Sequence, residues 1–287
     1  MGEQGKAAGI ERARIIETAA LIAPHIRRTP VIEVRPEDFG LAADGAPLTF
    51  KLELLQHAGS FKARGAFANL LLRQVPAAGV AAASGGNHGA AVAFAAMKLG
   101  VKARIFVPKV SSPAKIAQIR SYGAELVVEG ERYAEALALS EAYVAESGAM
   151  PVHAFDQPET MLGQGTLGRE FMEQAPEVDT FLVAVGGGGL IGGIGIAVKA
   201  RKPSVELIGV EPENAPSLAA AFARHGPVQV AMSPTLADGL AVAQTGAINY
   251  PIARRVVDRL VTVDEASIAR ILSTLTLSTV QVSRTSS

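Results

Sequence analysis

Short segments rich in valine, isoleucine and leucine alternate with alanine-rich stretches along most of this 287-residue chain. The apolar segments have the composition of buried strands, whereas the alanine-rich stretches are typical of helices. Strands that alternate with helices join into parallel sheets through right-handed crossovers, and the helices then cover the sheet. The sequence therefore predicts an α/β fold with open, mostly parallel sheets flanked by helices.

Two sets of such units follow one another along the chain. The first set is expected to contain strands at residues 79–83, 101–107 and 125–128 and helices at 84–99, 112–122 and 132–147. The second set is expected to contain helices at 161–174 and 190–200 and strands at 180–185 and 205–210. We therefore expect two domains, a small one at 69–155 inserted into a large one formed by 1–68 plus 156–287.

The composition excludes several classes of protein. The chain has no cysteine, which rules out disulfides and thiolate nucleophiles and is typical of a reducing compartment, so we expect a cytoplasmic protein. Lys and Arg total 27, as do Asp and Glu, and this balance gives no net field to attract nucleic acid or an anionic membrane. Neither the N-terminal residues nor the glycine-interrupted stretch 180–199 has the pattern of a signal peptide or a membrane span. The expected partner is a small substrate.

Lys62 is the first candidate for chemistry. It follows Gly59, Ser60 and Phe61 and stands among small residues at the start of an expected helix. Burial and the positive end of that helix both disfavour the ammonium form, which would lower the pKa and free the amine to attack an aldehyde. A lysine at a helix start is more often simply solvated, so this residue alone does not decide between the two interpretations.

The loop from Ser84 to Gly89 is the second candidate. It lies between an apolar strand and an alanine-rich helix, so its backbone N–H groups would face outward at a helix N-terminus and bind an anion. Ser84, Asn87 and His88 add side-chain hydrogen bonds suited to a carboxylate or a phenolic oxygen. Because serine, glycine and asparagine are also ordinary cap residues, a capped turn with His88 as a satisfied turn histidine is an equal alternative.

The run from Gly186 to Gly189 is the third candidate. Successive glycines between a strand and a helix let the backbone wrap closely around a phosphate. Gly187, Gly189 and Gly192 also have the spacing of a dinucleotide fingerprint, and Glu211 follows about twenty residues later, as a ribose-binding acid does. A nicotinamide-dependent oxidoreductase is therefore an alternative, but it leaves the first two candidates unexplained.

Together the three motifs resemble those of the fold-type II pyridoxal-phosphate enzymes, most closely the serine/threonine dehydratases and serine racemase. The resemblance extends from about Thr29 to Ala269. Further matching segments are Glu53-x-x-Gln56, Gly163-Gln164-Gly165-Thr166, Val210-Glu211-Pro212 and Ala237-Asp238-Gly239. The resemblance implies a two-lobed fold like that of the tryptophan synthase β subunit, pyridoxal 5'-phosphate as the cofactor, and a homo-oligomer, expected to be a dimer.

The resemblance also implies a role for each motif. Lys62 would carry the cofactor, Phe61 would pack against its pyridine ring, and Asn87 would bond its phenolic oxygen. The phosphate would be held by Gly186, Gly187, Gly188, Gly189 and Leu190. The substrate carboxylate would be bound by Ser84, Asn87 and His88.

The implied reaction is that of an ammonia-lyase. Lys62 would remove the Cα proton from serine, threonine or another β-hydroxy amino acid. Loss of the β-hydroxyl group and hydrolysis would then give a 2-oxo acid and ammonia. The sequence leaves open which β-hydroxy amino acid is the substrate.

Two features depart from the racemase-like members of the family. Serine racemases place a serine where this chain has Gly85, and glycine carries no proton, so racemisation by that route is disfavoured. Glu211 and the carbonyl of Ala215 match a divalent-cation site, but the expected acid falls on Ser217. We therefore expect no metal.

The C-terminus departs most. The segment from Thr274 to Ser287 resembles nothing in the family, which would continue after Ile268 with a helix, a turn, another helix and a last strand. The large domain is thus expected to be incomplete, with weak cofactor retention and poor catalysis. A cofactor-binding or structural relic with little activity is accordingly a further alternative.

Overall fold

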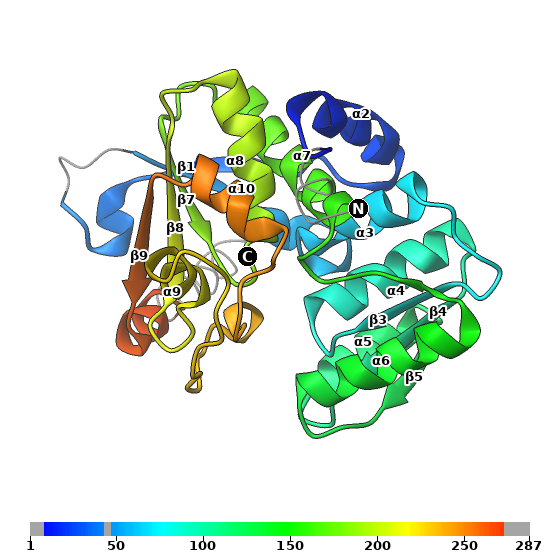
Figure 1. Ribbon diagram of the computed structural model, residues 1–287. Helices are drawn as coiled ribbons and strands as arrows, with labels where there is room; N and C mark the ends of the chain where they lie inside the picture. The colour runs from blue at the N-terminus through cyan, green and yellow to red at the C-terminus, as the bar shows by residue number, and fades with distance from the viewer. Residues whose placement is uncertain (1–8, 43–46, 273–287) are drawn as a thin grey trace, which may run out of the picture.

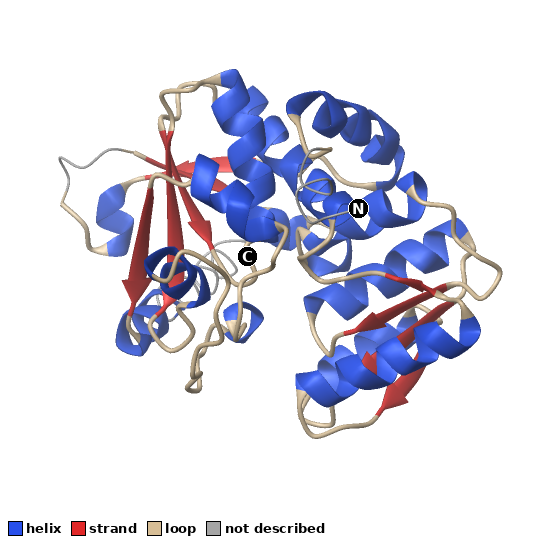
Figure 2. Ribbon diagram, viewed as in Figure 1, coloured by secondary structure: helices blue, strands red, loops and turns tan. Residues whose placement is uncertain are grey.

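The computed structural model describes residues 9–42 and 47–272 of the chain. Its strands form a four-stranded sheet in the order β5-β4-β3-β6, a three-stranded sheet in the order β7-β8-β9, and the pair β1 (Val31–Val34) and β2 (Leu48–Lys51). The two larger sheets are parallel throughout and lie apart, each with its own helices (Figures 1 and 2). This confirms the α/β class with open parallel sheets flanked by helices.

The four-stranded sheet is covered on both faces. Along its inner strand β3 (Val80–Ala83), Val80 and Ala82 join the apolar core that contains helix α4, whereas Ala81 and Ala83 join the core that contains helix α6. Burial on both faces explains why this strand reads as a continuous apolar run. The other elements around this sheet are α4 (Asn87–Leu99), β4 (Ala103–Val107), α5 (Pro113–Ser121), β5 (Glu125–Val128), α6 (Tyr133–Ser147) and β6 (Met150–Pro151).

The three-stranded sheet packs against two helices that approach each other closely, α7 (Pro158–Gln174) and α8 (Gly189–Arg201). Glycines make this contact possible, because a side chain at Gly193 would lie 2.5 Å from the carbonyl oxygen of Met161 and 2.7 Å from the nitrogen of Gly165. The other elements on this side are β7 (Thr180–Ala184), β8 (Glu206–Pro212), α9 (Ser217–Ala223), α10 (Asn249–Val256) and β9 (Arg259–Val263).

The element positions agree with the expected ones to within three residues at every end. The largest differences include the helix expected at 84–99, which begins at Asn87 because Ser84, Gly85 and Gly86 form the preceding turn. Helix α3 (Lys62–Leu72) contacts both α4 and α7 and so joins the surroundings of the two sheets. It runs unbroken across the expected domain boundary at 68/69, and the domain division itself stays a prediction.

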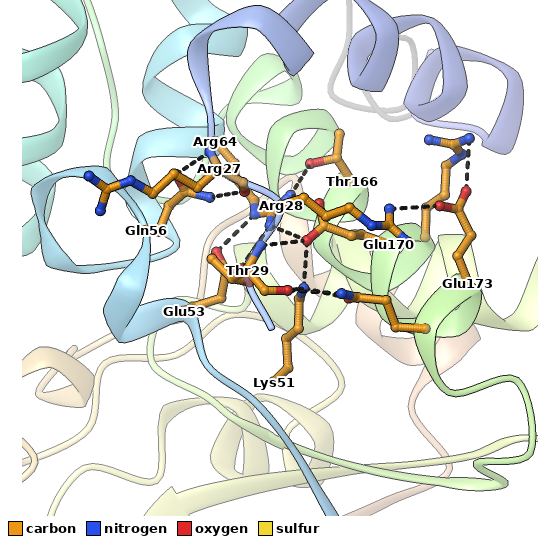
Figure 3. A network of polar contacts seen from close by, with 12 residues as sticks. Arg27, Arg28, Thr29, Lys51, Glu53, Gln56, Arg64, Thr166, Glu170 and Glu173 are labelled. Atoms are coloured by element: carbon orange, nitrogen blue, oxygen red, sulfur yellow. Dashed lines mark hydrogen bonds and ion pairs between the residues drawn. The ribbon is translucent and has the colours of Figure 1, made fainter. Parts of the chain in front are cut away.

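A buried ion-pair network joins α3 to Glu53 and to helix α7 (Figure 3). Arg64 is fully buried and bonds the carboxylate of Glu53 at 2.8 Å and that of Glu170 on α7 at 3.0 and 3.1 Å. Burial would raise the pKa of Glu170, but the hydrogen bonds and charges of Arg64 and Lys51 bring that pKa below its ordinary value. Because buried charges are costly unless they are paired, the geometry of α3 is strongly specified.

Among the residues that the structure describes, no helix is both long enough and apolar enough to cross a membrane.

Replacing Arg64 with leucine should lower the free energy of unfolding by about 3–5 kcal/mol, because the carboxylates of Glu53 and Glu170 lose the buried guanidinium that pairs with both of them. Chemical denaturation measures this change. Arg169→Leu is the matched control, since it removes an exposed ion pair to Glu173 on the same helix α7 and should cost less than about 1 kcal/mol. Equal losses in the two variants would contradict the anchoring role of Arg64.

Candidate active site

Lys62 is the first residue of α3, and its side chain is only partly accessible to solvent. Its Nζ donates a hydrogen bond to the carbonyl oxygen of Ala154 at 2.7 Å and lies 5.3 Å from the centre of the Phe61 ring. Burial lowers the pKa of Lys62 to about 8. An appreciable fraction of this lysine is therefore an unprotonated, nucleophilic amine near neutral pH, as burial at this position predicted.

The Ser84–His88 loop connects β3 to α4. The Ser84 hydroxyl accepts a hydrogen bond from the N–H of Gly86 at 3.1 Å, and Asn87 opens α4 with its side chain exposed. His88 is buried, with its Nε2 2.9 Å from the carbonyl oxygen of Val152. The loop thus presents Asn87 outward and turns His88 into the protein.

His88 is neutral at pH 7. Burial, assisted by the positive charge of Lys62, lowers its pKa to about 3. A carbonyl oxygen only accepts, so the ring carries its proton on Nε2, and its Nδ1 is then an acceptor that cannot bond a carboxylate. This geometry favours the alternative of a satisfied turn histidine, while the predicted contact of His88 with substrate stays untested.

Gly85 faces a serine that the sequence analysis missed. A side chain at position 85 would collide with the hydroxyl group of Ser111, which follows β4. The space that a serine at position 85 would need is therefore filled from another loop. No local motif marks Ser111, and only the folded chain brings residues 85 and 111 together.

The glycine run lies between β7 and α8, and Gly187 to Gly189 are buried. Gly188 has a φ of +90°, which favours glycine. The first intrahelical hydrogen bond runs from Gly192 N to Gly188 O, so the N–H groups of the first turn have no acceptor within the helix. No side chain in the described ranges caps this end of α8. Such an end binds anions, because the free N–H groups and the helix dipole act together.

One segment, residues 152–156, contacts all three motifs. Its Val152 bonds His88, its Ala154 bonds Lys62, and the Phe155 ring lies where a side chain at Gly187 would be. We call it the junction segment. No sequence motif marks this segment, so it could not be recognised as part of the site from the sequence.

Asp156 of the junction segment holds residues 247–249, which contact the glycine run. Its carboxylate accepts hydrogen bonds from the backbone N–H groups of Ala247, Ile248 and Asn249 at 2.9 to 3.3 Å. The Asn249 side chain in turn donates to the carbonyl oxygen of Gly187 at 2.7 Å. The glycine loop is therefore held from both sides by residues about ninety positions apart.

Glu211 does not have the environment of a ribose-binding or metal-binding acid. It is fully buried, and its carboxylate accepts from the N–H groups of Leu218 and Ala219 at 2.8 Å each. Burial raises the pKa of this carboxyl above its ordinary value. Ser217, at the expected position of a third metal ligand, donates to the carbonyl oxygen of Gly186 at 3.2 Å. Within residues 9–42 and 47–272, no group of three or more His, Cys, Asp or Glu side chains could hold a metal ion.

The parallel α/β fold brings a partly buried lysine, a polar loop and a glycine-rich helix start together at one segment, which agrees with the pyridoxal-phosphate enzymes that the motifs resemble. The family model described as pyridoxal-phosphate dependent enzyme matches residues 22–286, so the chain belongs to this family. This confirms the family that the motifs indicated, and the nicotinamide alternative loses its support.

Within the family, the chain is similar to ammonia-lyases and racemases. It is 45% identical over 227 residues to the L-threonine ammonia-lyase of Geobacter sulfurreducens, covering 78% of this chain and 56% of that enzyme. It is 43% identical over 242 residues to the phenylserine dehydratase of Ralstonia pickettii, covering 84% of this chain and 73% of that enzyme. The chain therefore spans only part of the length of these relatives.

Solved structures give the same picture. The structure of maize serine racemase matches with a TM-score of 0.85 and 34% identity, covering 90% of this chain and 78% of that one. A threonine deaminase from T.th. matches with a TM-score of 0.84 and 37% identity, covering 90% of this chain and 84% of that one. The segment from Thr274 to Ser287, expected to depart from the family, lies outside the described residues.

The reactivity of Lys62 should rise as the pH passes about 8 from below, because the amine reacts only when unprotonated and its pKa is about 8. The measurement is labelling by pyridoxal phosphate, trapped with borohydride and mapped by peptide mass spectrometry at a series of pH values. Lys109, whose pKa is raised by its hydrogen bond to Glu131, is the internal comparison and should be labelled only at higher pH. Parallel profiles for the two lysines would contradict the effect of burial.

Gly187→Ala should displace the Phe155 ring and lower the free energy of unfolding by about 1–3 kcal/mol, because the added methyl group meets that ring. It should also weaken pyridoxal phosphate binding, since the junction segment shifts with the ring. Gly226→Ala is the control, because a methyl group there meets nothing within 4 Å, and its cost should stay within about 0.5 kcal/mol. Thermal melting and cofactor titration of both variants test the pair.

Proposed function

We propose that this chain is a pyridoxal-phosphate-dependent ammonia-lyase that converts a small β-hydroxy amino acid of the serine or threonine type into a 2-oxo acid and ammonia. The observation that carries the proposal is the convergence of Lys62, the Ser84–His88 loop and the glycine run on the junction segment. The relatives named L-threonine ammonia-lyase support the same reaction class.

The residues present fit the cofactor. The amine of Lys62, with a pKa of about 8, suits an aldehyde, and the uncapped start of α8 suits a phosphate. The hydroxyl of Ser60, two residues before the lysine, is buried without a hydrogen-bond partner among the described residues. A buried polar atom of this kind is costly unless a ligand or water completes it, which agrees with a bound group beside Lys62.

In this proposal Lys62 holds the cofactor and then takes the proton from Cα of the substrate. Residues Gly186 to Leu190 would bind the phosphate, Asn87 would bond the phenolic oxygen, and Phe61 would pack against the ring. Ser84, Asn87 and His88 surround the substrate carboxylate, with His88 acting through its support of the loop. When bound, pyridoxal phosphate supplies an electron sink for the negative charge that develops at Cα.

The elimination balances without an oxidant or a metal. The Cα–H and Cβ–O bonds break, the proton passes to Lys62 and then to the leaving hydroxyl group, and one water leaves. Hydrolysis of the product takes up one water and releases ammonia, so the net products are a 2-oxo acid and ammonia. Gly85 carries no proton donor, which supports elimination over racemisation even though other relatives are named serine racemase.

The size of the substrate side chain is the open variable. One relative with 43% identity is named phenylserine dehydratase, so the assay includes an aromatic β-hydroxy amino acid.

We further propose that residues 69–155 form a small domain and residues 1–68 with 156–287 a large one, and that the chain assembles as a homodimer. The division is supported by the two separate parallel sheets.

Purified protein loaded with pyridoxal phosphate should release a 2-oxo acid from L-threonine, L-serine or L-phenylserine, and Lys62→Ala should abolish this release. The loss follows from removal of both the cofactor attachment and the base. Lys102→Ala, a change outside the motifs, is the control and should keep wild-type turnover. Wild-type turnover in Lys62→Ala would remove this lysine from the mechanism, and fully loaded protein inactive on the whole panel would overturn the lyase assignment.

A further inference from the structure

Lys115 lies in the first turn of α5 and reaches the Ser84–His88 loop from the side. Its Nζ donates a hydrogen bond to Oδ1 of Asn87 at 2.8 Å. Asn87 is in α4, and strand β4 lies between α4 and α5 in the sequence. The hydroxyl of Ser112 caps α5 by accepting from the N–H of Lys115 at 3.3 Å. The backbone from which Lys115 projects is therefore fixed, and its ammonium group points at one particular amide.

The β4–α5 loop, which leads into the helix turn that carries Lys115, is packed against the turn before Asn87. Ser111 fills the space above Gly85, so a side chain at position 85 would collide with it. This second contact is independent of the lysine and brings the β4–α5 loop against the turn that precedes Asn87. Lys115 thus belongs to a packed surface and is itself partly buried.

The hydrogen bond decides which way the Asn87 amide faces. An amide side chain has an acceptor oxygen at one corner and a donor nitrogen at the other, and an ammonium group can only donate. Lys115 therefore holds Oδ1 and turns Nδ2 away from itself. Among the described residues, no protein group accepts a hydrogen bond from that Nδ2, and the Asn87 side chain is exposed.

We propose that Lys115 is a positioning residue that presents Nδ2 of Asn87 as a hydrogen-bond donor to the anionic phenolic oxygen of bound pyridoxal phosphate. The proposal rests on the proposed function, because it assumes that this cofactor binds beside Asn87. Lys115 touches neither substrate nor cofactor. It fixes the orientation of the amide and places a positive charge behind it, which polarises the donor toward an anion.

The expected effect of removing Lys115 is moderate. Without it the amide populates both orientations, and the apparent affinity falls with the fraction that is competent to donate. The loss of the positive charge also removes its polarisation of the Asn87 Nδ2 donor, which weakens the hydrogen bond from that donor to an anionic oxygen further. Together these effects should weaken pyridoxal phosphate binding about threefold to tenfold.

The first experiment compares Lys115→Met with Lys109→Met in the full chain by cofactor titration and by the visible absorption maximum of the bound cofactor. Lys109 lies in the β4–α5 loop, and its ion pair among the described residues is to exposed Glu131, so its loss removes the same charge without touching Asn87. Lys115→Met should weaken binding and shift the absorption maximum, Lys109→Met should do neither, and Lys115→Arg should restore both. Identical behaviour of the two methionine variants would overturn the proposal.

A double-mutant cycle with Asn87→Ala tests whether Lys115 acts through the amide. In the Asn87→Ala background the Lys115→Met change should add nothing, because the group that it orients is gone. Additive losses would show that the lysine acts as a separate charge and would overturn the positioning role.

A cofactor-free measurement separates this proposal from the proposed function. In protein labelled with nitrogen-15, the side-chain amide signals of Asn87, assigned by their loss in Asn87→Ala, should shift in Lys115→Met and stay unchanged in Lys109→Met. Unshifted signals would overturn the proposal even if the wild type took up no pyridoxal phosphate. Shifted signals together with no cofactor uptake would instead refute the proposed function and, with it, the role of Lys115 toward that cofactor.

Discussion

The buried guanidinium of Arg64 is the interaction on which the position of the reactive lysine depends. Arg64 lies two residues after Lys62 on α3 and is held between the carboxylates of Glu53 and Glu170. A rotation or shift of α3 would move the buried guanidinium away from one or both carboxylates. Breaking a buried ion pair costs several times as much free energy as breaking a surface ion pair. Helix α3 therefore has one well-defined position, and this position fixes the backbone of Lys62 at its first residue.

The junction segment turns that fixed lysine into a site. A lysine side chain is long and flexible, so a fixed backbone alone does not place its amine. The carbonyl oxygen of Ala154 fixes the amine by accepting its hydrogen bond. The next residue, Phe155, packs on Gly187. Consecutive residues thus set the separation between the amine and the glycine loop, and a ligand that spans both must match it.

The sequence predicted the local parts of this arrangement. Apolar runs and alanine-rich stretches located the strands and helices, and the environment of Lys62 predicted its lowered pKa. Contacts between distant segments, such as Lys115 with Asn87, could not be predicted, because they have no periodicity and arise only when separate elements pack together. Gly187 was predicted to be glycine so that the backbone could approach a phosphate closely. In the structure the Phe155 ring already excludes any side chain at this position. A glycine can thus be needed both for packing and for ligand binding, and the sequence pattern alone does not distinguish the two reasons.

The charges around the motifs also indicate what kind of ligand they suit. The carboxylate of Asp156 is occupied by three backbone N–H groups, and that of Glu211 by two. Within the described part of the chain, burial alone accounts for the lowered pKa of Lys62. The start of α8 and the side-chain nitrogen of Asn87 add donors rather than acceptors. A site with many donors and with its carboxylates already engaged is completed by a ligand that brings its own negative charges, and a phosphate, a phenolate and a carboxylate each meet that requirement.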